Sequence, residues 1–359
     1  MRIFAENRNI IRLMTKQEII DSFDPNAPAV ADGGLFGLPF TAEHADIIII
    51  PVPWEVTVSF GSGTGEGPDA IKTASGQVDL YHQDFPELWK RGIFLDSCPA
   101  ELVELGKRAK DFAGDIIAAL EEGEIIEENA VLSDRLSKVN HACDEMNRWV
   151  KERAAYWKGQ GKLVGLIGGD HSVPLGYLQL QGDLYRDFGI LHIDAHMDLR
   201  EAYEGFTYSH ASIFYNAMER IPGAKLVQVG IRDFCEQEHR YAKERPARIS
   251  VFTDRSVRNR LFKGENWDAI SRDIIDRLPQ KVHISLDIDG LNPSLCPNTG
   301  TPVPGGLEYE ELIYLLNTLK ASGREIIGFD MCEVSASDNG WDENVGARLL
   351  FHLCGVLAG

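Results

Sequence analysis

The sequence predicts an α/β fold in which a single domain has three layers: a central, mainly parallel β-sheet with helices on both of its faces. Short apolar runs alternate with longer helical patterns, which is the order expected for parallel strands joined by right-handed crossovers. Several of these runs end in acidic residues and histidines, as buried parallel strands do when they carry polar groups to the carboxyl edge of a sheet. The predicted strands are residues 45–51, 163–168, 188–194, 225–231, 248–252, 281–287 and 325–330.

The chain of 359 residues is long for one domain, and we expect its extra length to lie in two segments. Residues 1–44 contain several prolines and glycines and predict an N-terminal extension, helical only near 17–23, ahead of a domain spanning 45–359. Within that domain, residues from about 85 to 160 are rich in helix formers and predict a helical insertion. An amphipathic helix is expected from Ser133 onward, because apolar residues recur there at helical spacing: Leu136, Val139, Cys143, Met146 and Val150.

The first predicted strand contains four consecutive isoleucines, a pattern typical of a strand buried on both faces. Pro51 and Pro53 are expected to end it, because proline cannot donate to a sheet. The glycine-rich loop 59–68 then leads into a helix at Asp69; its glycines do not follow a strand as G-x-G-x-x-G, which argues against a phosphate loop. Trp54 is equally compatible with the core, the rim of a site, or an aromatic wall beside a substrate.

The net charge of -19 argues against nucleic acid or an anionic membrane as the main partner and favours a small cationic guest. No apolar run is long enough to span a bilayer, and residues 1–14 lack a secretory pattern, so we expect a cytoplasmic protein. The six cysteines are scattered without a C-x-x-C pair, which indicates reduced thiols rather than a disulfide framework or a zinc cluster.

One strand end carries a cluster of potential metal ligands. Asp194, His196 and Asp198 follow the apolar run 188–193, and residues two apart in an extended chain point to the same side. A single acid or histidine in this position would usually be a solvated or capping residue. Three of them on one side can bind one cation or a closely spaced pair.

Two further strand ends repeat this design. Asp170 and His171 follow the run 163–168 and two glycines, and Asp287 and Asp289 end the run 281–286. Two acids on one face of a strand end would repel each other and raise the pKa of one of them, and a bound cation removes that repulsion. Three strand ends therefore predict one metal-binding edge of the sheet.

These motifs, in their order along the chain, resemble the ureohydrolase family, which includes arginase and agmatinase. The matching segments, which cover the chain from about Asp46 to its end, are Gly168-Gly169-Asp170-His171-Ser172, His192-Ile193-Asp194-Ala195-His196-Met197-Asp198 and Ser285-Leu286-Asp287-Ile288-Asp289, followed by Gly300-Thr301-Pro302-Val303 and Gly305-Gly306-Leu307. The resemblance implies an arginase-like fold, a homo-oligomer (trimer or hexamer) and two bound Mn²⁺ ions per chain, with Ni²⁺ or Co²⁺ as alternatives.

The resemblance also implies the role of each ligand. Asp194 and Asp287 would bridge the two ions, His171 and Asp198 would complete one, and His196 and Asp289 the other. Asp198 would in addition accept a hydrogen bond from the bridging hydroxide and take its proton after the attack. The expected reaction is hydrolysis of a guanidino compound to urea and an amine, which needs a strong nucleophile because guanidinium is a poor electrophile.

Two more residues match family positions that act on the substrate. His210, in a loop after the metal motif, would pass a proton to the leaving amine, although Ala211 stands where the family usually has glycine. Glu333 follows the run 326–329 and would bind the guanidinium, whose planar donors match a carboxylate.

The segment 199–208 addresses the rest of the substrate. Arginases carry a run rich in Ser, Thr and Asn there, which holds the amino-acid head; this chain instead has Arg200, Glu201, Tyr203, Glu204 and Tyr208. We expect Tyr203 and Glu204 to contact a small or cationic guest, as in agmatinase-type members. The candidate substrates are agmatine, free guanidine, guanidino acids and, least favoured, arginine.

Two other function classes fit the sequence less well. A metallophosphoesterase also uses Asp, His and paired metals, but its Gly-Asn-His-Asp or Glu elements and basic phosphate-binding residues are not evident. A non-catalytic scaffold or sensor of the same fold would be free to lose the six ligands, His210 and Glu333, all of which are present.

Overall fold

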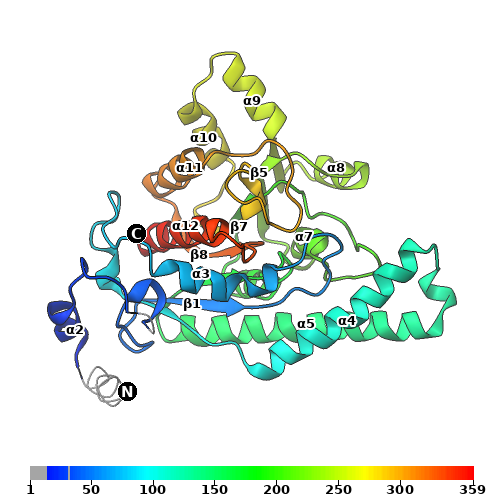
Figure 1. The fold of residues 1–359 in the computed structure, drawn as a ribbon. Coiled ribbons are helices and arrows are strands. Elements are labelled where there is room, and N and C mark those ends of the chain that lie inside the picture. Colours follow the sequence, from blue (N-terminus) through cyan, green and yellow to red (C-terminus); the bar gives the residue numbers. More distant parts are fainter. Residues whose placement is uncertain (1–13, 31–32) are drawn as a thin grey trace.

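The computed structural model describes residues 14–30 and 33–359, and its core is one eight-stranded sheet with the order β2-β1-β3-β8-β7-β4-β5-β6 (Figure 1). Every adjacent pair of strands is parallel, so the predicted mainly parallel sheet is fully parallel in this part of the chain. The strands are β1 (Ile47–Val52), β2 (Ile93–Leu95), β3 (Leu163–Gly168), β4 (Phe188–Ile193), β5 (Ala224–Ile231), β6 (Ile249–Thr253), β7 (Lys281–Asp287) and β8 (Glu325–Cys332). The seven predicted strands are all present, with ends shifted by at most two residues.

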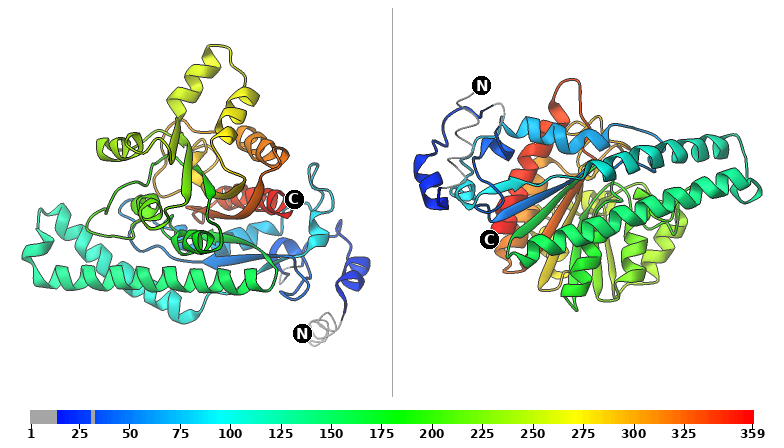
Figure 2. Two further views of the ribbon diagram at one scale, coloured as in Figure 1. Left: turned by 180° about the vertical axis from the view of Figure 1, so that it is seen from behind. Right: turned by 90° about the horizontal axis from the view of Figure 1, so that it is seen from below.

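Helices cover both faces of the sheet, which confirms the predicted three layers (Figure 2). Connections that run toward β2 and those that run toward β6 must use opposite faces if each crossover is right-handed. Accordingly α3, α10, α11 and α12 lie on one face, and α5, α6 and α7 on the other. The α-helices are α2 (Lys16–Ser22), α3 (Gly67–Ser75), α4 (Ala100–Glu121), α5 (Ala130–Gly159), α6 (Leu175–Leu184), α7 (Ile213–Arg220), α8 (Glu236–Lys243), α9 (Asp254–Phe262), α10 (Trp267–Asp276), α11 (Tyr309–Ala321) and α12 (Trp341–Ala358).

The segment predicted as a helical insertion contains the edge strand β2 as well as the long helical hairpin α4–α5 (Figure 1). This strand was missed because it has only three residues, of which Ile93 alone is buried. Asp96 follows it and accepts hydrogen bonds from Arg153 and from Trp157 Nε1 on α5, each at 2.6 Å. The buried Asp96 carboxylate thereby joins the hairpin to the edge of the sheet.

The prediction that Pro51 ends the first strand was wrong. Pro51 lies inside β1 and pairs with Ile167 of β3. The carbonyl of Ile49 accepts a hydrogen bond from Asp96 N, so odd-numbered residues of β1 direct their backbone groups toward β2. β2 pairs with β1 only as far as Ile49, and Pro51 therefore turns its missing N–H toward a side where the sheet has no further partner.

Trp54 belongs to the core rather than to the rim of a site. Its side chain is buried, and a Cβ added to Gly106 of α4 would lie 3.0 Å from its ring. The described part of the N-terminal extension also packs on the domain, since Phe36 is buried with its ring centroid 4.9 Å from that of Phe351 on α12. None of the helices in the described ranges is both long and apolar enough to cross a membrane.

Candidate metal centre and substrate site

The predicted ligands gather at one edge because four central strands end beside one another. β3, β8, β7 and β4 are neighbours in the sheet, and all run in the same direction. Their carboxyl ends are followed by His171, Glu333, the pair Asp287 and Asp289, and the Asp194 motif, respectively. Parallel sheets of this kind place ligand sites at the carboxyl ends of their strands.

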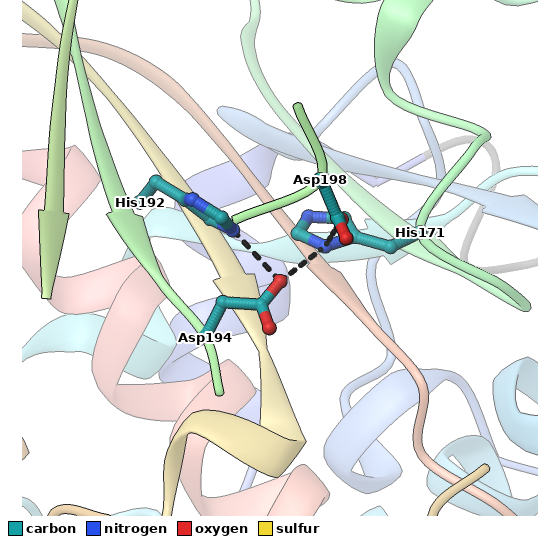
Figure 3. Close-up of side chains that lie close together, drawn as sticks. All are labelled: His171, His192, Asp194 and Asp198. Atoms are coloured by element: carbon teal, nitrogen blue, oxygen red, sulfur yellow. Dashed lines mark hydrogen bonds and ion pairs between the residues drawn. The ribbon is translucent and has the colours of Figure 1, made fainter. Parts of the chain in front are cut away.

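The first group of ligands surrounds one imidazole nitrogen. His171 Nδ1 lies 3.1 Å from Asp194 Oδ2, 3.4 Å from Asp198 Oδ2 and 3.4 Å from Asp287 Oδ2. Figure 3 shows the Asp194 and Asp198 carboxylates directed at this ring. All four side chains are buried.

The second group shares Asp194 with the first. The other carboxylate oxygen of Asp194, Oδ1, lies 3.4 Å from His196 Nδ1, and Asp289 Oδ2 lies 3.0 Å from the same nitrogen. Asp287 Oδ1 accepts the Asp289 backbone N–H at 2.8 Å. The structure thus brings the six predicted ligands into two adjoining groups with Asp194 between them. The bridging role of Asp287 stays a prediction.

These carboxylates are too crowded to be stable as a set of bare anions. Burial raises the pKa of Asp198 to about 7, and the Asp194 charge adds to the rise. Burial, Asp289 and Asp194 together raise the pKa of Asp287 well above its usual range. Burial lowers the pKa of the His171 imidazole, but its carboxylate neighbours outweigh that and raise it well above the ordinary value. Protons and metal ions compete for such a set, and four carboxylates with two imidazoles suit divalent ions such as Mn²⁺.

Backbone strain also concentrates here. Among the described residues, four non-glycine residues have a positive φ, and three of them are Asp198 at 53°, Glu204 at 54° and Glu333 at 65°. The left-handed region is costly for residues with a side chain, and it persists where the surrounding structure enforces it. The left-handed backbone of Asp198, in the segment after β4, and of Glu333, directly after β8, turns each carboxylate toward the cluster.

Glu333 is held next to the first group of ligands. Its Oε1 accepts the backbone N–H of His171 at 2.8 Å, and no other described residue donates to Oε2. A Cβ added to Gly300 would lie 3.2 Å from Oε2, so the backbone of Gly300 passes close to this oxygen. Burial and the Asp170 charge raise the pKa of Glu333 well above its ordinary range. An uncompensated carboxylate in this place would be stabilised by a cationic partner.

Comparison with known proteins identifies the architecture that holds these residues. The model of the Arginase family matches residues 45–355. The chain belongs to the Arginase family. N(1)-aminopropylagmatine ureohydrolase of Thermus thermophilus is 33% identical to it over 314 residues, which are 88% of this chain and 91% of that protein.

Two further similarities extend across most of the chain. Agmatinase of Pyrococcus horikoshii is 27% identical over 339 residues, which are 94% of this chain and 97% of that protein. The crystal structure of proclavaminate amidinohydrolase from Streptomyces clavuligerus shares the fold, with a TM-score of 0.70 at 21% identity over 93% of this chain and 99% of that one. The predicted ureohydrolase of agmatinase type, a hydrolase that converts a guanidino compound to urea and an amine, is thereby confirmed.

In this arginase-family chain His210 lies near the ligand cluster, close enough for the charges of Asp170, His196 and His171 to act on its pKa. His210 begins the short helix η5 (His210–Ser212), and its Nδ1 is 3.5 Å from Thr57 Oγ1 in the loop after β1. Burial lowers the pKa of His210, and the Asp170 charge partly opposes this. Ala211 has no positive φ, so the replacement of the family's glycine causes no backbone strain.

Tyr203 and Glu204 have different neighbours near the site. The Tyr203 ring stands edge-on to His210, with centroids 6.5 Å apart, and Arg200 stacks on Tyr203 at 4.8 Å. Glu204 has a buried oxygen, Oε2, without a hydrogen-bond partner in the described structure. Burial and then Glu121 raise its pKa, whereas Arg200 lowers it. Tyr203 therefore borders His210, while Glu204 lies nearer the end of α4.

Several residues behind the ligands were missed by the sequence analysis. His192 Nε2 is 2.8 Å from Asp194 Oδ2 (Figure 3). His192 Nδ1 lies 3.0 Å from the amide nitrogen of Gln228. The Gln228 amide can only donate there, so His192 donates Nε2–H to Asp194 and supports it without being a ligand. Ser285 and Asp330 support His171 in a similar manner. The available signal was a polar residue inside an otherwise apolar buried strand.

Proposed function

We propose that this arginase-family enzyme is a binuclear hydrolase of a guanidino amine, with agmatine or an aminopropyl-extended agmatine as its substrate class. The observation that carries the proposal is the position of Glu333, a buried carboxylate next to the first group of ligands, with one oxygen that accepts no hydrogen bond from the described residues. Such an oxygen can accept hydrogen bonds from a planar guanidinium while the guanidinium carbon faces the ligand cluster.

The metal assignment rests on the donor set. His171, Asp194, His196, Asp198, Asp287 and Asp289 offer oxygen and imidazole donors, which suit Mn²⁺ and also accept Ni²⁺ or Co²⁺. When bound, a pair of such ions would lower the pKa of a shared water and polarise the guanidinium. The crowding of buried carboxylates around His171 and His196 supports two ions rather than one.

The side chains have separate tasks in the proposed reaction. Glu333 orients the guanidinium, and Asp198 accepts a proton from the attacking water. His210 passes a proton to the leaving amine, so that one water and one guanidino compound become urea and an amine. His210 is half-buried beside Thr57 and therefore stays accessible to solvent, with which it can exchange protons.

The loop that follows the metal motif, residues 199–209, favours a substrate with a cationic tail. We call this segment the tail loop. It contains Tyr203 beside His210 and the partly buried Glu204, and it lacks the Ser, Thr and Asn run that arginases use for the amino-acid head. The net charge of -19 favours the approach of cations. The name of the Thermus thermophilus relative, an aminopropylagmatine ureohydrolase, is in line with a long cationic substrate.

Urea release measured over a panel of substrates tests this proposal. Protein loaded with Mn²⁺, and separately with Ni²⁺, is assayed with N(1)-aminopropylagmatine, agmatine, guanidinobutyrate, guanidinoacetate, guanidine and L-arginine. We expect the two guanidino amines to give the highest kcat/KM. A highest value for guanidine or a guanidino acid would contradict the proposed substrate class, and a complete lack of urea with either metal would contradict the enzymatic function.

We also propose a cytoplasmic location and a homo-oligomeric state for the enzyme. All six cysteines are unpaired thiols, and Cys143, Cys296, Cys332 and Cys354 are buried, which is in keeping with a reducing cytoplasm. By resemblance to the family we also propose a trimer or hexamer. Light scattering during gel filtration measures the assembly directly, and a monomeric mass would contradict it.

A further inference from the structure

A chain of buried polar groups lies behind His171, on the side away from the ligand carboxylates. His171 Nε2 is 3.0 Å from Ser285 Oγ on β7, and Ser285 Oγ donates to Asp330 Oδ1 on β8 at 2.7 Å. The second oxygen of Asp330 is 2.7 Å from His283 Nε2 on β7. Ser285, Asp330 and His283 are fully buried, and none of them is among the predicted ligands. A buried carboxylate therefore lies two hydrogen bonds behind one metal ligand.

The direction of each hydrogen bond follows from the donors available. Gln181 on α6 places its amide nitrogen 3.1 Å from the Ile327 carbonyl and 3.4 Å from His283 Nδ1, so His283 Nδ1 accepts and its Nε2–H donates to Asp330. The single hydroxyl hydrogen of Ser285 goes to Asp330. Ser285 Oγ must then accept from Nε2–H of His171, which fixes the proton of that ring on Nε2.

This arrangement determines which nitrogen of His171 can act as a ligand. With the proton on Nε2, the lone pair is on Nδ1, and Nδ1 is the nitrogen that lies 3.1 to 3.4 Å from Asp194, Asp198 and Asp287. Nδ1 facing three carboxylates must hold either a proton or a metal ion, and the raised pKa of His171 has the same cause. An anionic partner behind a ligating histidine also increases the electron density on its ligating nitrogen.

We propose that Asp330 is a positioning residue for one metal ion: through Ser285 it holds Nε2 of His171 protonated and the ring in place, so that Nδ1 is the nitrogen available to the metal, and it thereby selectively strengthens metal binding at the His171 centre. The proposal rests on the binuclear function proposed above. Asp330 itself touches neither the substrate nor the ions.

The His196 centre has no equivalent support. The His196 side chain is 24% exposed, compared with 1% for His171, and no described residue forms a hydrogen bond with its Nε2. Its Nδ1 faces Asp194 and Asp289 without a buried anion behind the ring. Removal of the Asp330 charge should therefore affect the two centres unequally, which a general loss of packing would not do.

The first experiment compares metal binding by metal-free wild-type protein and by Asp330→Asn. The asparagine amide can donate to Ser285, which frees the serine hydrogen for His171 Nε2 and places the imidazole proton on Nδ1. Calorimetric titration with Mn²⁺ should show about a 10- to 100-fold weaker affinity for one of the two ions, and little change for the other. Mn²⁺ is the probe, and metal content after dialysis gives an independent count.

Asp96→Asn is the matched control. Asp96 is likewise a buried carboxylate that accepts hydrogen bonds from α5 residues, but it follows the edge strand β2 rather than the site. We expect this variant to lower the unfolding temperature while both Mn²⁺ affinities stay at the wild-type value. A similar weakening of both ions in Asp330→Asn, or a weakening of one ion in Asp96→Asn, would overturn the proposal.

A double-mutant cycle separates positioning from a structural role. If Asp330 acts through His171, Asp330→Asn should weaken Mn²⁺ binding at that centre in the wild type and should add nothing once His171→Asn is present. Independent, additive effects would overturn the proposal. Ser285→Ala should reproduce a large part of the effect of Asp330→Asn, since it breaks the same path.

A different result would contradict the proposed binuclear function itself. If wild-type protein binds only one Mn²⁺ while it is fully active, the binuclear function is wrong. If it binds two and Asp330→Asn binds both with unchanged affinity, only the role of Asp330 is wrong.

Discussion

The strand-end cluster and the tail loop illustrate two ways of building one site. The predicted ligands His171, Asp194, Asp287 and Asp289 are placed by neighbouring parallel strands, and all four are buried with defined hydrogen-bond partners. The tail loop (199–209) has little regular structure; its Tyr203 pairs with Phe206, and Glu204 adopts a positive φ of 54°. The sheet therefore fixes the reaction chemistry, whereas the loop can change its side chains without disturbing the sheet.

The largest effect is expected at the sheet. Asp287→Asn should bind neither ion firmly and should lose at least about a thousandfold in kcat, or about 4 kcal/mol, because Asp287 is predicted to bridge the ions and already lies 3.4 Å from His171 Nδ1. Metal analysis of the purified variant and a urea assay check this. His171→Asn is the comparison, since it should deplete mainly one ion. Retention of both ions by Asp287→Asn would show that Asp287 is not a bridge.

The cluster could be predicted from the sequence because period-2 spacing at the ends of apolar runs is a local signal. Asp194, His196 and Asp198 satisfy it within one segment. The supporting residues could not be found in that manner, because Ser285 and Asp330 meet only when β7 and β8 are neighbours. Strand order is a property of the whole sheet, and it is not encoded in the spacing of either strand alone.

The errors elsewhere have the same origin. Pro51 was expected to end β1, yet it is tolerated because β2 pairs only as far as Ile49. The strand β2 itself was too short to stand out from the helix-forming residues around it. The conformation of the tail loop was also beyond prediction, since Glu204 and Gly205 both have a positive φ where the loop passes close to Leu136 of α5, a residue distant in the sequence.

The second-largest effect is expected for Glu333, which directly follows β8 and is proposed to bind the guanidinium of the substrate. Glu333→Gln should keep both metal ions and lose a charge-assisted pair with the guanidinium worth about 1.5 to 3 kcal/mol. Steady-state assays should then show kcat/KM for agmatine reduced by roughly 10- to 150-fold. Unchanged metal content is the internal control. Turnover at the wild-type rate would mean that the guanidinium binds elsewhere.

Substrate choice tests the loop rather than the sheet. We expect kcat/KM for agmatine to exceed that for L-arginine by at least about tenfold, or about 1.4 kcal/mol. The physical reason is that the tail loop offers carboxylates and aromatic rings, and Glu201 and Glu204 would repel the carboxylate of arginine. Measurement of both substrates at one metal loading decides the matter. A preference for arginine would show that the loop does bind an amino-acid head.

The smallest expected effect, and the most specific to the tail loop, belongs to Glu204. Glu204 is half-buried, and its ion pair with a flexible ammonium would be screened by solvent, so Glu204→Gln should cost up to about 1 kcal/mol. The KM for agmatine should therefore rise by roughly two- to fivefold with little change in kcat. Guanidine has no tail, and its kcat/KM should stay the same in this variant.

Glu201→Gln removes the same charge from an exposed position of the same loop and controls for the general electrostatic field. If both variants raise the KM for agmatine equally, the loop acts through its overall charge; if guanidine is affected as strongly as agmatine, Glu204 acts on the reaction centre and not on the tail.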